Sequence, residues 1–155
     1  MKVPALLFKL INLKPVHRRG MTVRHAYGVV KLSVDDGSRL LKEYSAFQIY
    51  PGLSGRGVSL RSNNYPTNFV QVEGNTDSIV LKEYQEDEEF KTKSSFILKE
   101  ELQTNGEHIE ISFESIFRPN HYIAVYHDNI KLVSSAVVNS SDAPIKFEAI
   151  HFKSK

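Results

Sequence analysis

One spacing recurs three times along this sequence of 155 residues. In each case a leucine precedes a phenylalanine by 15 positions: Leu32 and Phe47, Leu81 and Phe96, and Leu132 and Phe147. The three leucines lie 49 and 51 residues apart, so that three units of similar length fill the chain. An internal period of this length indicates that one small supersecondary unit is repeated around a shared core.

A direct overlay of the second and third units supports the repeat. Residues 58–72 overlay residues 111–125 without a gap, and both read as strand, proline-containing turn and strand. Residues 12–25 are the counterpart in the first unit, where Arg19 takes the place of the turn proline.

The apolar residues within each unit alternate with polar ones, as at Ile111 and Phe113, and many are β-branched or aromatic. This pattern is typical of short strands. No window of ordinary helix length has a clean apolar stripe, and the best candidate, residues 82–93, is nearly all polar. Three units of about four strands each predict an all-β chain with a β-trefoil fold, because a propeller needs at least four blades.

We expect a single domain over residues 1–155, with repeats at approximately 8–53, 54–103 and 104–155. The predicted core consists of the apolar positions that recur in all three repeats. They are Leu13, Leu60 and Phe113; Val23, Val70 and Ile123; and the three leucine and three phenylalanine positions of the 15-residue spacing.

The composition excludes several classes of protein. The chain has no cysteine, which rules out disulfides, thiolate catalysis and thiolate metal sites. The apolar run in residues 1–8 is too short for a secretory leader and is interpreted as a first strand. We therefore expect a soluble protein without membrane insertion, either cytoplasmic or secreted without a recognisable signal peptide.

Two adjacent segments of the chain carry a family resemblance. They are Phe-Gln-Ile-Tyr-Pro-Gly-Leu at residues 47–53 and the stretch 57–66, which ends in Asn-Asn-Tyr-Pro. With residues 89–96 and 111–122, they resemble the arabinose-binding β-trefoil of α-L-arabinofuranosidase B enzymes, the family 42 carbohydrate-binding modules. The resemblance covers essentially the whole chain. It implies a non-catalytic module without a cofactor, whose partner is an arabinose-containing glycan or another carbohydrate.

The resemblance also implies where a sugar would bind. The family uses a His at the end of the second strand and an Asp shortly before the phenylalanine that closes each repeat. The His position holds His25 in the first repeat and valine in the others, Val72 and Val125. The Asp position reads Tyr44, Lys93 and Pro144. At most one pocket is therefore expected, and its predicted carbohydrate-binding residues are His25, Tyr27, Asp36 and Tyr44.

Two other functions stay open. The last repeat, through residues 95–97 and 113–125, also resembles interleukin-1-type cytokines, which implies a protein receptor as partner. Residues 1–34 contain no acidic side chain, so a basic face could bind a heparin-like polyanion, with nucleic acid not expected. The candidate polyanion-binding residues are Arg18, Arg19, Arg24 and Lys31.

The sequence shows no catalytic motif. It lacks a phosphate-binding glycine loop, a zinc-protease helix motif and a nucleophile elbow. The six histidines have no compact ligand spacing, so we expect neither a metal site nor catalytic residues.

Overall fold

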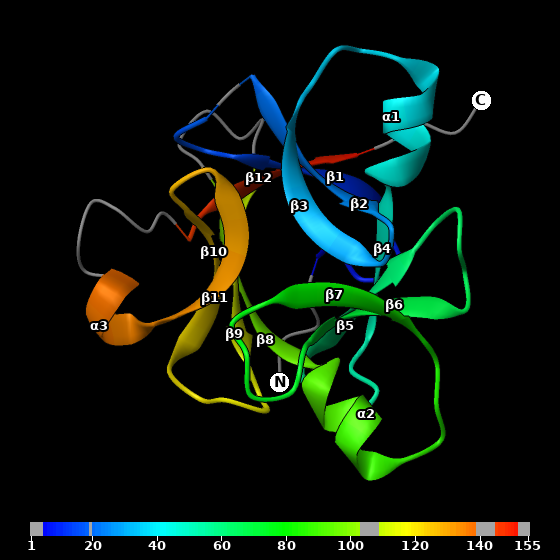
Figure 1. Ribbon diagram of the computed structural model, residues 1–155, viewed down its shortest axis with the longest axis vertical. Helices are drawn as coiled ribbons and strands as arrows, with labels where there is room; N and C mark the ends of the chain where they lie inside the picture. Colours follow the sequence, from blue (N-terminus) through cyan, green and yellow to red (C-terminus); the bar gives the residue numbers. More distant parts are fainter. Residues whose placement is uncertain (1–4, 19, 103–108, 139–144, 152–155) are drawn as a thin grey trace.

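The computed structural model describes residues 5–18, 20–102, 109–138 and 145–151 and contains twelve strands and three short helices (Figure 1). Six strands form a barrel: β1 (Leu10–Pro15), β4 (Phe47–Pro51), β5 (Val58–Ser62), β8 (Phe96–Leu102), β9 (Ile109–Ser115) and β12 (Phe147–His151). Their antiparallel pairing runs β1 to β4, β5, β8, β9 and β12 and returns to β1. The ring is therefore closed, which leaves no free edge.

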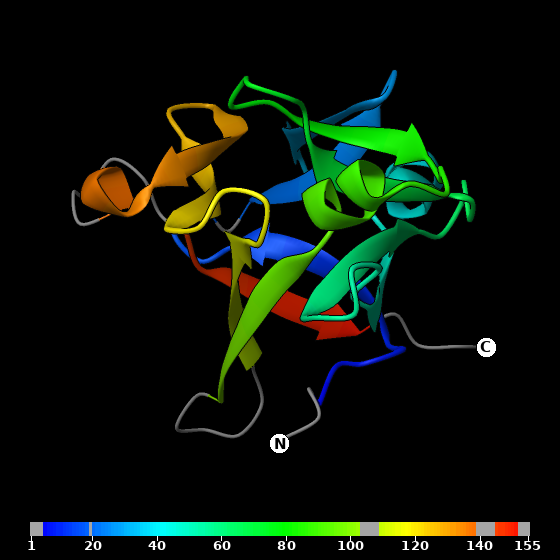
Figure 2. The same ribbon diagram turned by 90° about the horizontal axis from the view of Figure 1, so that it is seen from below.

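The other six strands form three hairpins that cover one end of the barrel. The hairpins are β2 (Met21–Ala26) with β3 (Val29–Val34), β6 (Asn68–Val72) with β7 (Ile79–Glu83), and β10 (His121–Tyr126) with β11 (Asn129–Ser134). They surround the centre of Figure 1 and lie above the barrel strands in Figure 2. A six-stranded barrel capped by three hairpins is a β-trefoil, so the predicted fold class is confirmed.

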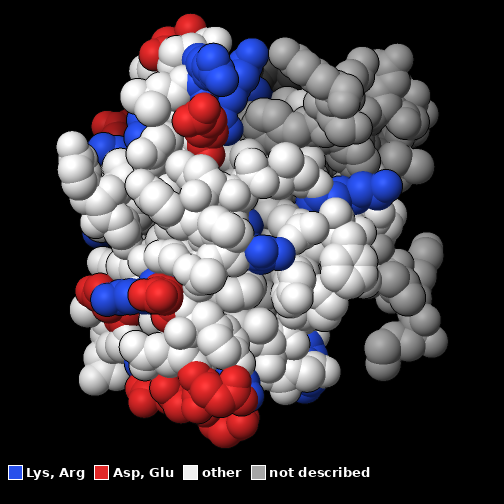
Figure 3. Space-filling model, turned by 90° about the vertical axis from the view of Figure 1, so that its right-hand side faces the viewer, with Lys and Arg blue, Asp and Glu red and all other residues white. Residues whose placement is uncertain are grey.

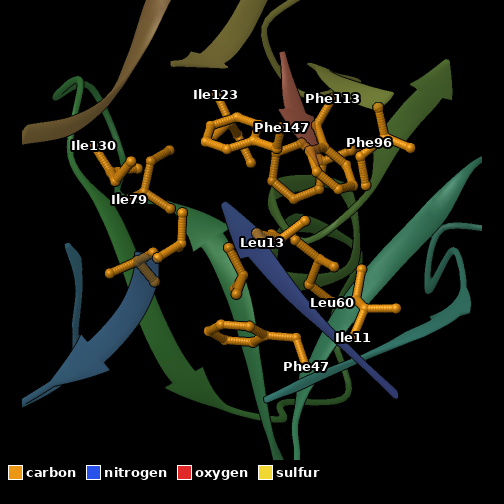
Figure 4. Close-up of a cluster of buried hydrophobic side chains, with 14 of the residues drawn as sticks. Ile11, Leu13, Phe47, Leu60, Ile79, Phe96, Phe113, Ile123, Ile130 and Phe147 are labelled. Atoms are coloured by element: carbon orange, nitrogen blue, oxygen red, sulfur yellow. The ribbon is translucent and has the colours of Figure 1, made fainter. Parts of the chain in front are cut away.

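The core explains why the repeat is visible in the sequence. All twelve predicted core positions are buried, and none is more than 6% exposed. Figure 4 shows four phenylalanines, Phe47, Phe96, Phe113 and Phe147, converging with aliphatic side chains from other strands. Burying each such side chain contributes roughly 1.5–3 kcal/mol. These positions are therefore constrained to remain large and apolar.

The hairpin registers repeat as well. The cross-strand partners are Val23 and Leu32 in the first hairpin, Val70 and Leu81 in the second, and Ile123 and Leu132 in the third. Directly opposed residues of an antiparallel pair point to the same face, so each pair enters the core together. The same pairing in every repeat brings one leucine to the core from the second strand of each hairpin.

Three short helices were not expected from the sequence. They are α1 (Arg39–Tyr44), α2 (Glu88–Lys93) and α3 (Ser135–Val138). Ser38 Oγ accepts the backbone N–H of Leu41 at the start of α1, and Asp87 Oδ1 accepts that of Phe90 at the start of α2. Each of these two helices buries only that one apolar side chain. A helix of six residues is too short to show an apolar stripe in the sequence. For this reason the mostly polar residues 82–93 gave no sign of α2.

The strand predicted at residues 1–8 is wrong for the part that the structure describes. Residues 5–8 form turns, and the first strand begins at Leu10. Leu6 is nevertheless fully buried, and the Phe8 N–H donates to the Ile49 carbonyl at 2.6 Å. None of the helices in the described segments has the length and apolar composition needed to cross a membrane.

Candidate functional site

A pocket of about 420 Å³ opens at the first repeat. It lies between the β2–β3 hairpin, helix α1 and the turn that joins β5 to β6. Its lining residues are Arg24, Ala26, Tyr27, Gly28, Leu40, Tyr44 and Tyr65. Two of the predicted sugar-binding residues, Tyr27 and Tyr44, thus come together at this pocket.

His25, the third predicted residue, lies beneath the pocket and does not line it. Its side chain is 1% exposed, and its ring centroid is 4.9 Å from that of Tyr44 and 5.3 Å from that of Tyr65. Side chains alternate along a strand, so His25 shares the inner face of β2 with Val23, while Arg24 takes the opposite face. The alternation of side chains along residues 21–26 is the signal in the sequence from which this inward position could have been predicted.

Asp36, the fourth predicted residue, does not line the pocket. Its carboxylate accepts the backbone N–H of Ser38 at 2.8 Å, in the turn that leads into α1. The neighbouring Asp35 forms an ion pair with Lys14 and accepts the N–H of Gly37. Both carboxylates therefore shape the loop before α1.

A hydrogen-bond chain links His25 to the rim of the pocket. Its Nε2 lies 2.7 Å from Asn64 Oδ1, which can only accept, so this nitrogen carries the hydrogen. Ser62 Oγ donates to the same Oδ1 at 2.9 Å and accepts the backbone N–H of Tyr65 at 3.2 Å. Desolvation by burial lowers the pKa of His25, the hydrogen bond to Asn64 partly opposes this, and the charge of Arg24 lowers the pKa further.

Tyr44 and Tyr65 form the aromatic part of the pocket. Their hydroxyl oxygens are 3.3 Å apart and their rings meet edge to face, with centroids 6.1 Å apart. The hydrogen bond with Tyr65 raises the pKa of Tyr44, so this phenol stays neutral and can donate or accept. The Arg24 guanidinium carbon lies 5.3 Å from the centroid of the Tyr44 ring, within cation–π range.

The position of Tyr65 is taken by an arginine in each of the other repeats. The overlay that aligns Leu13, Leu60 and Phe113 places Arg18 and Arg118 at this position. The guanidinium of Arg118 binds the β6–β7 turn, at Asp77 Oδ1 and at the carbonyls of Gly74 and Thr76. These three bonds measure 3.0, 3.1 and 2.9 Å.

Arg18 does the same to the third hairpin. It donates to Asp128 Oδ1 at 3.0 Å and to the His127 carbonyl at 2.9 Å, both in the β10–β11 turn. Each arginine thereby ties its loop to the hairpin of the neighbouring repeat, whereas Tyr65, from the second repeat, borders an open pocket beside the hairpin of the first.

The other positions that correspond to the sugar pocket are occupied by packing residues. Val72 and Val125 are buried in the core, and Pro144 lies outside the described residues. Lys93 pairs with Glu89 at 2.6 Å and packs over the ring of Phe117. A smaller hollow of about 230 Å³ remains in the second repeat, and the described residues that line it include no tyrosine.

The described residues among the predicted basic set have different surroundings. Arg18 is bound to the third hairpin, Arg24 lines the pocket, and Arg19 lies outside the described residues. Lys31 is exposed on β3, directly opposite Arg24. On the face shown in Figure 3, acidic side chains gather at the lower end, the end at which α2 lies in Figure 1.

No cluster of three His, Asp or Glu side chains that could hold a metal ion is found in the described part of the chain. The pocket itself is lined by one cation, three tyrosines and small or apolar residues. This lining suits a ligand with flat apolar faces and hydrogen-bonding groups at its edges.

Comparison with known proteins agrees with this picture. A family model described as the Alpha-L-arabinofuranosidase B (ABFB) domain matches residues 9–98, more than half of the chain. An alpha-L-arabinofuranosidase of Hypocrea jecorina and an arabinofuranosidase/B-xylosidase of Trichoderma koningii are each 37% identical to this chain over 57 residues. Those residues are 37% of this chain and 11% of either relative, so the match spans about a tenth of their length.

Solved structures share the fold. A GH54 a-l-arabinofuranosidase soaked with a cyclic sulfate inhibitor superposes with a TM-score of 0.74 at 20% identity, covering 97% of this chain and 32% of that one. The cytolethal distending toxin from Actinobacillus actinomycetemcomitans gives 0.69 at 10% identity, covering 98% of this chain and 97% of that one. The family model, the repeat and the trefoil agree, and the chain belongs to the family of Alpha-L-arabinofuranosidase B (ABFB) domains.

Proposed function

We propose that this chain is a non-catalytic carbohydrate-binding module that binds an arabinose-containing glycan in the pocket of its first repeat. The observation that carries the proposal is the pair of hydrogen-bonded tyrosines, Tyr44 and Tyr65, at the mouth of an open pocket. The names of the relatives, which are arabinofuranosidases, support arabinose as the sugar.

The lining supplies the two kinds of contact that a sugar needs. A sugar ring has an apolar face, which packs on the face of a tyrosine, and hydroxyl groups at its edge. Tyr65 is 47% exposed in the absence of a ligand, so its ring offers apolar area to cover. The phenol oxygens of both tyrosines can donate and accept, while the Arg24 guanidinium can only donate.

Two arginines, Arg18 and Arg118, support one sugar-binding pocket rather than three. Arg18 and Arg118, the counterparts of Tyr65 in the first and third repeats, are already bound to the neighbouring hairpins. A sugar in either place would have to displace charge-assisted hydrogen bonds that already satisfy the guanidinium. The module is therefore proposed to be monovalent.

The lining also favours binding over hydrolysis. Glycoside hydrolysis ordinarily uses two carboxylic acids on either side of the scissile bond. Neither Asp nor Glu is among the described residues that line this pocket. The sugar would thus be held without an acid to protonate its leaving group.

Calorimetric titration tests the proposal with two ligands, a xylo-oligosaccharide carrying arabinofuranosyl branches and the same chain without them. The branched ligand is expected to bind, and Tyr65→Ala is expected to weaken its binding about tenfold or more, because the ring removes apolar area from water. Tyr84→Ala is the matched control, because Tyr84 is 37% exposed but is not among the residues that line this pocket. Failure of the branched ligand to bind at millimolar concentration, or equal binding by Tyr65→Ala, would exclude the proposal.

A further inference from the structure

The pocket of the first repeat carries a positive charge that no described residue neutralises. Arg24 lies in its lining, where no carboxylate is found in the described residues. The Nε of Arg24 donates to the His25 carbonyl at 3.2 Å, and the guanidinium packs against the ring of Tyr44. These contacts hold the guanidinium in place. They leave both terminal nitrogens without a hydrogen-bond partner among the residues that the structure describes.

Lys31 adds a second charge beside the first. It is the cross-strand partner of Arg24 in the β2–β3 hairpin, so the two side chains share a face of the sheet. Lys31 is exposed and has no ion pair within the described segments. Like charges at directly opposed positions are destabilising, and an anion between them would remove the repulsion.

Three other basic residues of the described chain differ from this pair. Lys14 pairs with Asp35, Arg18 with Asp128, and Arg118 with Asp77. Each of these cations sits beside a carboxylate of the chain itself. Arg24 instead lines the pocket, and Lys31 is exposed beside it on the neighbouring strand.

Building on the proposed function, we propose that the glycan bound at this pocket is acidic. Its carboxylate or sulfate group binds the terminal nitrogens of Arg24 and the ammonium group of Lys31, while a sugar ring packs on Tyr65. The planar guanidinium presents parallel N–H groups that match an oxyanion, and its contact with Tyr44 fixes their direction. A uronic acid residue supplies such an oxyanion next to a ring with an apolar face.

The test compares two ligands that differ only in charge. One is a xylo-oligosaccharide that carries both arabinofuranosyl and glucuronic acid branches, and the other is the same material after chemical reduction of its carboxyl groups to alcohols. At low salt the acidic form is expected to bind about tenfold more tightly, a ratio typical of one charge-assisted contact. Half-molar salt should shrink the ratio, because it screens partly exposed charges. A sulfated oligosaccharide of the same length, run in parallel, distinguishes sulfate from carboxylate as the source of the oxyanion.

Three variants locate the effect. Arg24→Gln and Lys31→Gln are each expected to reduce the ratio of the two affinities toward one, and two separate variants guard against a local folding defect in either. Arg56→Gln makes the same change in charge on an exposed turn and should keep the ratio. Equal affinity for the two ligands, or a ratio unchanged in both pocket variants, overturns the acidic ligand and leaves sugar binding intact. Binding of neither ligand overturns the proposed function along with it.

Discussion

His25 Nε2 lies 2.7 Å from Asn64 Oδ1, and this bond joins strand β2 of the first repeat to the β5–β6 turn of the second. Through Ser62, the same oxygen is connected to the backbone N–H of Tyr65. A buried imidazole therefore positions the turn that carries an exposed aromatic ring. His25 stabilises the pocket from below.

The stability of the protein should fall as the pH drops through the ordinary pKa of histidine. Burial lowers the pKa of His25 below its ordinary value of 6.5, so in this range the unfolded chain binds more protons than the folded chain. The stability contributed by neutral His25 is present above pH 6.5 and is lost as the pH falls toward the lower pKa of the folded state. Urea unfolding between about pH 7.5 and 5.5 should show this decrease in the free energy of unfolding.

Two variants separate His25 from the other titrating groups. His25→Gln should unfold more easily at neutral pH and show a smaller decrease on acidification, whereas His17→Gln, in the exposed turn after β1, should behave like the parent. Asp35 and Asp36 have pKa values held below the ordinary 3.8 by hydrogen bonds, so their losses come at lower pH. Parallel pH curves for His25→Gln and the parent would contradict this assignment.

The arginines that bind the hairpins should contribute unequally to stability. Arg118 makes three hydrogen bonds and is 23% exposed, and Arg118→Ala is expected to lower the free energy of unfolding by about 1–2 kcal/mol. Arg18 is 41% exposed and its partner Asp128 is 90% exposed. Solvent screens this second pair, so that Arg18→Ala should cost less than about 1 kcal/mol.

Urea unfolding of both alanine variants at one pH and salt concentration measures the difference. An effect of Arg18→Ala equal to or larger than that of Arg118→Ala would show that burial does not govern these contacts. Raising the salt concentration supplies a second check, because the smaller effect should shrink further while the backbone hydrogen bonds of Arg118 persist.

The core could be predicted from the sequence because equivalent buried positions recur as large apolar residues in every repeat. Positions such as Phe47, Phe96 and Phe147 are buried at equivalent places in the barrel, so each must be large and apolar, and each follows its leucine by 15 residues. The helices have no comparable repeated pattern in the sequence. Each of the first two depends on a single capping side chain and one buried residue, Leu41 or Phe90.

The site was harder to predict, because its residues do not repeat. Tyr65 stood out in the sequence only as part of a family motif, and its role depends on a turn from the second repeat folding back over the first. Arg118 binds the β6–β7 turn, which lies more than 40 residues earlier in the chain. No local sequence pattern predicts such a contact. Asp36 has the right chemistry for a sugar, but its short loop engages its carboxylate with the backbone at Ser38.

Gly57, in the motif that follows the proline-glycine-leucine turn, should tolerate no side chain. Its φ is 65°, and a Cβ there would lie 2.2 Å from the carbonyl oxygen of the core residue Phe96. Gly57→Ala should therefore cost more than about 2 kcal/mol, from the left-handed backbone and the displaced strand together. Gly20→Ala is the control, because no atom of the described residues lies within 4 Å of the place that its methyl group would take, and it should change stability by less than about 0.5 kcal/mol. Equal melting temperatures for the two variants would mean that the β4–β5 loop can move away from β8, which the closed barrel argues against.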